Sequence, residues 1–162
     1  MAQSVLGSLT LGYRPLWNRA RALAGVRLFV HADDPGVDGQ HLLRTLEELW
    51  SAESPDLLLV ARSRELLGGL LAHATRADPA IEVPAAWLDD ARLRGALREA
   101  HARGARLVLD GTPDELRPLA GERWAARRAV QLAPLDAASS QTAAAHAGRF
   151  QNGLIDHSPE PP

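Results

Sequence analysis

Strand-length apolar segments alternate along this chain with segments that have the periodicity of an amphipathic helix. The apolar segments are residues 8–13, 26–31, 56–61, 80–83, 105–110 and 128–133. Predicted helices lie between most of them, at residues 40–53, 64–76 and 89–103. A repeated order of strand, helix and strand predicts an α/β fold with a largely parallel sheet and right-handed crossovers.

The first connection of this sheet differs from the others. Only about a dozen residues separate the first two apolar segments, which is too few for a crossover helix but enough for an antiparallel hairpin with a long loop. We therefore expect the first strand to run antiparallel to its neighbour.

Two helix boundaries carry local signals. Gly104 follows the third predicted helix, where a left-handed C-terminal cap would lie. The segment 112–115 reads Thr, Pro, Asp, Glu, which combines a threonine N-cap, a proline at the first helical position and a glutamate at the capping-box position. It predicts a helix that begins after Thr112.

Composition limits the possible partners. The 162 residues carry a formal net charge of −2, so no basic surface for nucleic acid is expected. No apolar run approaches the roughly 20 residues that span a bilayer, and the chain contains no cysteine for disulfides or thiolate metal sites. These features predict a cytoplasmic protein that binds neither nucleic acid nor membrane.

Three segments together resemble a known family. They are "LGYRPLWNRARALAGVRLFVHA" (11–32), "LLLVARSRELL" (57–67) and "AIEVPAAWLDDARLRGALREAHARGARLVLDG" (80–111), within a likeness that covers residues 8–135. The chain resembles the EAL-domain family of bacterial cyclic di-GMP phosphodiesterases and is most similar to the shortened EAL-like halves found ahead of HDOD domains in signal-transduction proteins. The resemblance implies an incomplete or shortened (β/α) barrel, TIM-barrel-like, with an antiparallel first strand.

The metal-binding and catalytic pattern of that family is largely missing from this chain. The glutamate that names the family is matched by Arg27, and a further group of its polar positions is matched by Ala61, Gly111, Gln131 and Ala133. An arginine in place of a carboxylate ligand should expel a divalent cation. The resemblance therefore implies a domain that does not hydrolyse cyclic di-GMP and that needs no metal or cofactor.

Four residues are candidate ligand-binding positions at the strand mouths: Arg14, Arg27, Glu82 and Asp110. Glu82 and Asp110 match carboxylates of the family, and Arg14 replaces a glutamine that would touch the ligand. We expect Glu82 to form an ion pair with Arg27 in place of a metal bridge, because a buried carboxylate without a partner is costly. Asp110 has a second interpretation, as a cap of the turn before Thr112.

The four tryptophans are interpreted as core or interface anchors, with stacking on guanine as an alternative for Trp87, which lies near a strand mouth. They are Trp17, Trp50, Trp87 and Trp124.

Length predicts an open sheet. A complete (β/α) barrel takes about 250 residues, whereas this chain has six predicted strands in an EAL-like domain at residues 1–136. The edge strands of an open sheet expose unpaired backbone groups, so we expect another segment or chain to cover them. Candidates are a helix at 137–150, a second copy of the chain or a downstream domain, with 151–162 as a disordered tail or linker.

The expected function is a non-catalytic EAL-like module for signalling or protein interaction, with a protein partner or self-association. A metal-independent receptor for cyclic di-GMP, in which arginines contact phosphate, is one alternative. A residual metal-dependent phosphodiesterase that uses Glu82 and Asp110 is the other.

Overall fold

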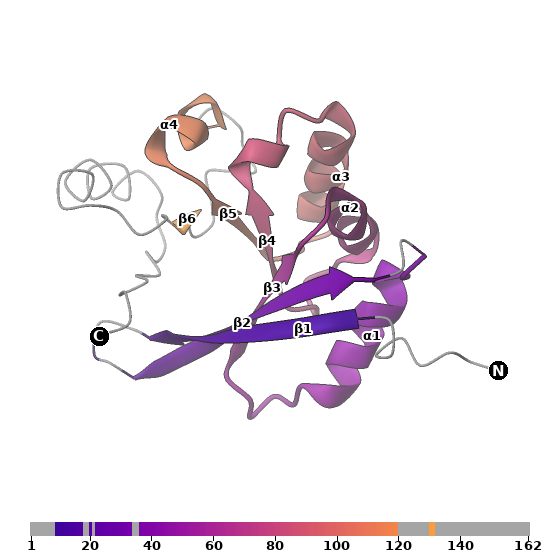
Figure 1. Ribbon diagram of the computed structural model, residues 1–162, viewed down its shortest axis with the longest axis vertical. Helices are drawn as coiled ribbons and strands as arrows, with labels where there is room; N and C mark the ends of the chain where they lie inside the picture. The colour runs from indigo at the N-terminus through magenta and orange to yellow at the C-terminus, as the bar shows by residue number, and fades with distance from the viewer. Residues whose placement is uncertain (1–8, 18–19, 21, 34–35, 120–129, 132–162) are drawn as a thin grey trace.

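The computed structural model describes residues 9–17, 20, 22–33, 36–119 and 130–131 (Figure 1). The expected helix at 137–150, the tail at 151–162 and Trp124 lie outside these residues. Within the described part, six strands form one sheet in chain order, β1 to β6. They are β1 (Leu9–Trp17), β2 (Leu23–Ala32), β3 (Asp56–Ala61), β4 (Ala80–Pro84), β5 (Leu107–Asp110) and β6 (Val130–Gln131).

The direction of the strands agrees with the sequence pattern. β1 pairs with β2 in antiparallel fashion, and every later neighbour is parallel. The α/β class and the antiparallel first strand are thus confirmed. β1 and β6 form the two edges of the described sheet and do not pair with each other, so these strands form an open sheet.

Three helices cover one face of the sheet, and β1 and β2 extend past them as a long hairpin (Figure 1). The helices are α1 (Gly39–Leu49), α2 (Arg64–His73) and α3 (Ala91–Ala102). Asp38, Ser63 and Asp90 are their N-caps, and each side chain accepts a hydrogen bond from a backbone N–H of the first turn. Shorter elements follow β4 and β5: η2 (Ala85–Trp87), α4 (Pro113–Leu116) and η3 (Arg117–Leu119).

Several predicted boundaries were wrong. The helix expected at 40–53 ends at Leu49, because Trp50 is extended and its indole Nε1 donates to the Pro55 carbonyl at 2.7 Å. The strand expected at 8–13 continues to Trp17, since β2 begins earlier than predicted, at Leu23, and supplies partners along the whole length.

Alternate residues of the strands enter two different apolar clusters. Leu59, Ile81 and Leu109 point to the helices, where they join the main core. This core takes from the helices Leu42, Leu43, Leu46, Leu66, Leu67, Leu70, Leu71, Leu93, Leu97 and Ala100. On the other face, Leu16, Leu58 and Val108 form a small second cluster. Apolar residues therefore support both sides of the central strands.

Two glycines are required by backbone geometry. Gly104 has φ of 86° just after α3, which confirms the predicted left-handed cap. A Cβ on Gly39 would come within 2.5 Å of the Gly69 carbonyl carbon, so the start of α1 lies directly against α2. The predicted capping box is also present: Thr112 N–H donates to the Glu115 carboxylate at 2.7 Å, and α4 begins at Pro113.

Among the described helices, none has the length and apolar character that crossing a bilayer requires.

Candidate functional site

The candidate site lies on the sheet face opposite the three helices. Arg27 of β2 pairs in register with Leu58 of β3, and Glu82 of β4 pairs with Val60 of β3. Asp110 is the last residue of β5. Because alternate strand residues share a face, these three polar side chains stand above the small cluster that contains Leu58. Asp110 lies at the carboxyl end of β5, where ligands of α/β sheets commonly bind, whereas Arg27 and Glu82 lie inside β2 and β4.

Arg27 joins the two carboxylates. Its Nη2 donates to Glu82 Oε1 in a close ion pair and lies 3.5 Å from Asp110 Oδ2. The predicted pairing of Glu82 with Arg27 is therefore confirmed. Asp110 takes part in the same group, whereas the N–H of Thr112 in the following turn is bonded by Glu115.

Burial dominates the electrostatics of this group. Glu82 is only 1% exposed, and the Arg27 side chain only 14%. Removal from water raises the pKa of Glu82 to about 7, although the hydrogen bond and charge of Arg27 favour the ionised form, and the nearby Asp110 adds to the rise. Near neutral pH the carboxyl of Glu82 is thus divided between its protonated and ionised forms.

Arg14 and Arg62 extend the positive side of the site. The guanidinium carbons of Arg14, Arg27 and Arg62 lie 5.9, 5.0 and 6.0 Å from the centroid of the Phe29 ring. Arg14 is contributed by β1, directly opposite Arg27 in the register, and Arg62 follows the last residue of β3. Guanidinium groups from β1, from β2 and from the residue after β3 thus lie within cation–π range of one aromatic ring.

Sequence reasoning identified Arg14, Arg27, Glu82 and Asp110, and the structure brings all four into one region. It missed Phe29 and Arg62. The position of Arg62 immediately after a predicted strand was an available signal, because residues at that end of parallel strands gather at one edge of the sheet.

The tryptophans occupy different surroundings. Trp50 and Trp87 are partly buried and pack against the main core, as expected for anchors, whereas Trp17 is 52% exposed on β1. Trp87 lies in η2 beside Arg64, whose guanidinium carbon is 5.9 Å from its ring.

The residues do not fit the divalent-cation site that the family resemblance would suggest. The Arg27 guanidinium occupies the space between Glu82 and Asp110, where a bridging cation would have to bind. Within the described residues, no group of three or more histidine, cysteine, aspartate or glutamate side chains could hold a metal ion.

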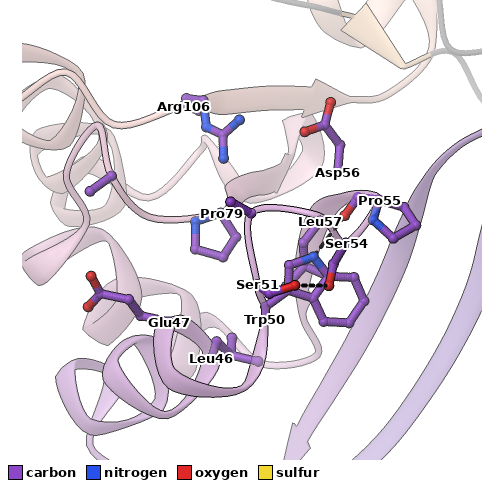
Figure 2. A pocket seen from close by; sticks show the side chains of 12 residues that line it. Leu46, Glu47, Trp50, Ser51, Ser54, Pro55, Asp56, Leu57, Pro79 and Arg106 are labelled. Carbon is purple, nitrogen blue, oxygen red and sulfur yellow. Dashed lines mark hydrogen bonds between the residues drawn. The ribbon is translucent and has the colours of Figure 1, made fainter.

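A pocket of about 300 Å³ lies at the other end of the strands (Figure 2). Its wall includes Asp56, the first residue of β3, together with Pro79 and Arg106, which precede β4 and β5. Trp50 also lines it, and the Ser51 and Ser54 hydroxyls are joined by a hydrogen bond of 3.1 Å. None of the four sequence-predicted site residues contributes to this pocket.

A scan against models of protein families gave no match for this chain. A search of curated proteins likewise found no similar protein.

Proposed function

We propose that this protein contains a degenerate, shortened EAL-like barrel domain that acts as a non-catalytic module for signalling or protein interaction. The proposal rests on the sequence likeness at residues 8–135 and on one structural observation. Arg27 contacts both Glu82 and Asp110, the two carboxylates that the likeness assigns to a metal site.

The charge of Arg27 explains why this site would not work as a phosphodiesterase. A cation coordinated by Glu82 and Asp110 would lie within roughly 5 Å of the guanidinium, where a +1 and a +2 charge repel by about 7 kcal/mol at an effective dielectric constant of about 20. A repulsion of that size weakens cation binding by about five orders of magnitude. No step of metal-assisted hydrolysis is therefore assigned to these residues.

Exposed apolar side chains on the first hairpin support the interaction role. Leu11, Tyr13, Trp17 and Leu23 are 47%, 76%, 52% and 47% exposed, and all four belong to β1 and β2. Neighbouring apolar residues left open to solvent are typical of surfaces that bind another protein. A protein partner or a second copy of the chain on this hairpin is consistent with the proposed role.

Calorimetric titration of the full chain with Mg²⁺ and Mn²⁺, combined with a hydrolysis assay on cyclic di-GMP, tests the non-catalytic proposal. We expect neither metal binding nor turnover. Measured hydrolysis that depends on metal would support the residual phosphodiesterase and overturn the proposal. Saturable binding of intact cyclic di-GMP in the presence of EDTA would support the receptor alternative instead.

The variant Arg27→Glu provides a positive test of the same reasoning. It places a third carboxylate beside Glu82 and Asp110 and removes the repelling charge, so millimolar Mn²⁺ should raise its melting temperature. The wild type and the neutral control Arg27→Gln should respond less. If Mn²⁺ shifts all three proteins equally, the charge of Arg27 is not what excludes the cation.

The interaction role is tested by solution size. Sedimentation of the wild type should show self-association or a complex with a protein partner. The double variant Tyr13→Ser with Trp17→Ser should lose this association, while its circular dichroism spectrum stays unchanged. A wild type that stays monomeric and binds no protein would contradict this part of the proposal.

A further inference from the structure

Hydrogen bonds hold the walls of the pocket at the amino ends of the parallel strands (Figure 2). On one wall, the Trp50 indole donates to the Pro55 carbonyl at 2.7 Å, which fixes the connection between α1 and β3. On another, the backbone N–H of Thr75 donates to the Asp78 carboxylate at 2.7 Å, which fixes the turn before β4. A ligand of this pocket therefore has little of the protein to order when it binds.

The lining of the pocket has the composition of a small-molecule site. Its apolar residues are Leu46, Trp50, Ala52, Pro55, Leu57, Ala77 and Pro79. Its charged residues are Glu47, Asp56 and Arg106. Ligand pockets are mostly apolar with a few polar groups that orient the ligand, and a volume of about 300 Å³ lies at the small end of their range.

The opposite charges of Asp56 and Arg106 face this one pocket without pairing. Asp56 begins β3 and Arg106 directly precedes β5, so their backbones are separated by β4 and lie about 10 Å apart. Among the described residues, neither side chain has an oppositely charged group within ion-pair distance.

The guanidinium of Arg106 is held in place without being neutralised. Its Nε and Nη2 donate to the backbone carbonyl of Asp78 at 3.3 and 3.1 Å. A carbonyl carries no net charge, so the positive charge of Arg106 stays available to an anionic group, and the second edge of the guanidinium keeps its N–H donors. A ligand with one positive and one negative group matches the pair that Arg106 and Asp56 present.

We propose that this pocket binds a small zwitterion of the amino-acid class. Its carboxylate lies toward Arg106, because the planar fork of a guanidinium is a strong partner for carboxylate oxygens. Its ammonium group lies toward Asp56, and Glu47 adds a second negative charge that favours a cation at the pocket. The apolar part of the ligand packs against Trp50 and Pro79.

This site is separate from the group formed by Arg27, Glu82 and Asp110, none of which lines the pocket. It goes beyond the proposed interaction role and does not rest on it, because none of the exposed apolar residues of the first hairpin lines it either. Its test and the tests of the proposed function can therefore fail separately.

Calorimetric titration of the full chain with L-leucine and with 6-aminohexanoate tests the proposal at two separations of the charged groups. We expect saturable binding of at least one of them, with a stoichiometry of one and a dissociation constant below about 1 mM. Leucinamide and hexylamine keep only the amine, whereas 4-methylpentanoate and hexanoate keep only the carboxylate. Each analogue should bind about tenfold more weakly than its parent, because one charged contact is lost.

Two variants test which residue holds which group. Asp56→Asn should weaken the zwitterion by about tenfold and leave the carboxylate-only analogue unchanged. Arg106→Gln should weaken the zwitterion by about the same factor and leave the amine-only analogue unchanged. The matched controls are Glu99→Gln and Arg92→Gln, because both residues are exposed on α3 and do not line the pocket. Neither control should change binding.

Three results would overturn the proposal. The first is that neither zwitterion binds saturably. The second is that an analogue with a single charge binds as tightly as its parent. The third is that the control variants weaken binding as much as Asp56→Asn and Arg106→Gln do, which would indicate non-specific attraction.

Discussion

The pair formed by Arg27 and Glu82 predicts an unusual dependence of stability on pH. Burial raises the folded-state pKa of Glu82 from 4.5 to about 7. Between these pH values the folded chain holds a proton that the unfolded chain has released. The contribution of Glu82 to stability is therefore greatest below pH 4.5 and falls as the pH rises through about 7.

The size of the effect follows from that shift. Each pKa unit corresponds to about 1.4 kcal/mol, so the ionisation of Glu82 should lower the free energy of unfolding by about 3 kcal/mol across this range. Glu82→Gln keeps the shape of the side chain but cannot ionise. The difference in unfolding free energy between wild type and Glu82→Gln should fall by that amount as the pH rises.

Removing the cation should enlarge the same trend. In Arg27→Met, Glu82 loses the hydrogen bond and the charge that lower its pKa, so its ionisation becomes more costly. We expect Arg27→Met to lose about 1 kcal/mol near pH 5, where a neutral carboxyl loses one hydrogen bond. Near pH 9, where a buried charge loses its partner, the loss should reach about 3–5 kcal/mol.

Urea denaturation followed by tryptophan fluorescence, at several pH values from 5 to 9, measures both differences. Arg117→Met is the control, because Arg117 pairs at the surface with Asp114 at 2.6 Å and is 67% exposed. It should show no trend with pH. A constant difference between wild type and Glu82→Gln at all pH values would refute the assignment of a buried, perturbed carboxyl. So would an Arg27→Met variant that is as stable as Arg117→Met near pH 9.

Three further variants test the fold. Leu67→Ala removes a fully buried α2 side chain from the main core, and thermal or urea unfolding should show a loss of about 2–5 kcal/mol. Asp90→Ala deletes the N-cap of α3, whose carboxylate accepts from Arg92 N–H at 2.8 Å, and should cost about 1 kcal/mol; a melting temperature equal to wild type would show that the cap is dispensable. Gly104→Ala forces a side chain into a left-handed conformation and should cost about 1 kcal/mol, in contrast to a gain if the helix simply continued.

Local patterns in the sequence were enough to predict the main elements of the fold. The strand at 56–61 and the start of the helix at 64 agree with the structure, because period-two and period-3.6 patterns depend only on which residues must be buried. The length of the first connection was enough to predict that β1 runs antiparallel to β2. Helix ends were less predictable. Trp50 continues the apolar pattern of α1, but α1 ends before it, and the Trp50 indole donates a hydrogen bond to the Pro55 carbonyl.

The site depended on tertiary structure to a greater degree. The sequence alone indicated that Glu82, within a buried strand, needed a cation, and it offered Arg27 as the partner. It could not show that Arg14 and Arg62, which are 48 positions apart in the chain, approach the same Phe29 ring. That proximity arises only when β1, β2 and β3 are placed side by side, because the register of a sheet, and not the spacing of residues along the chain, decides which side chains become neighbours.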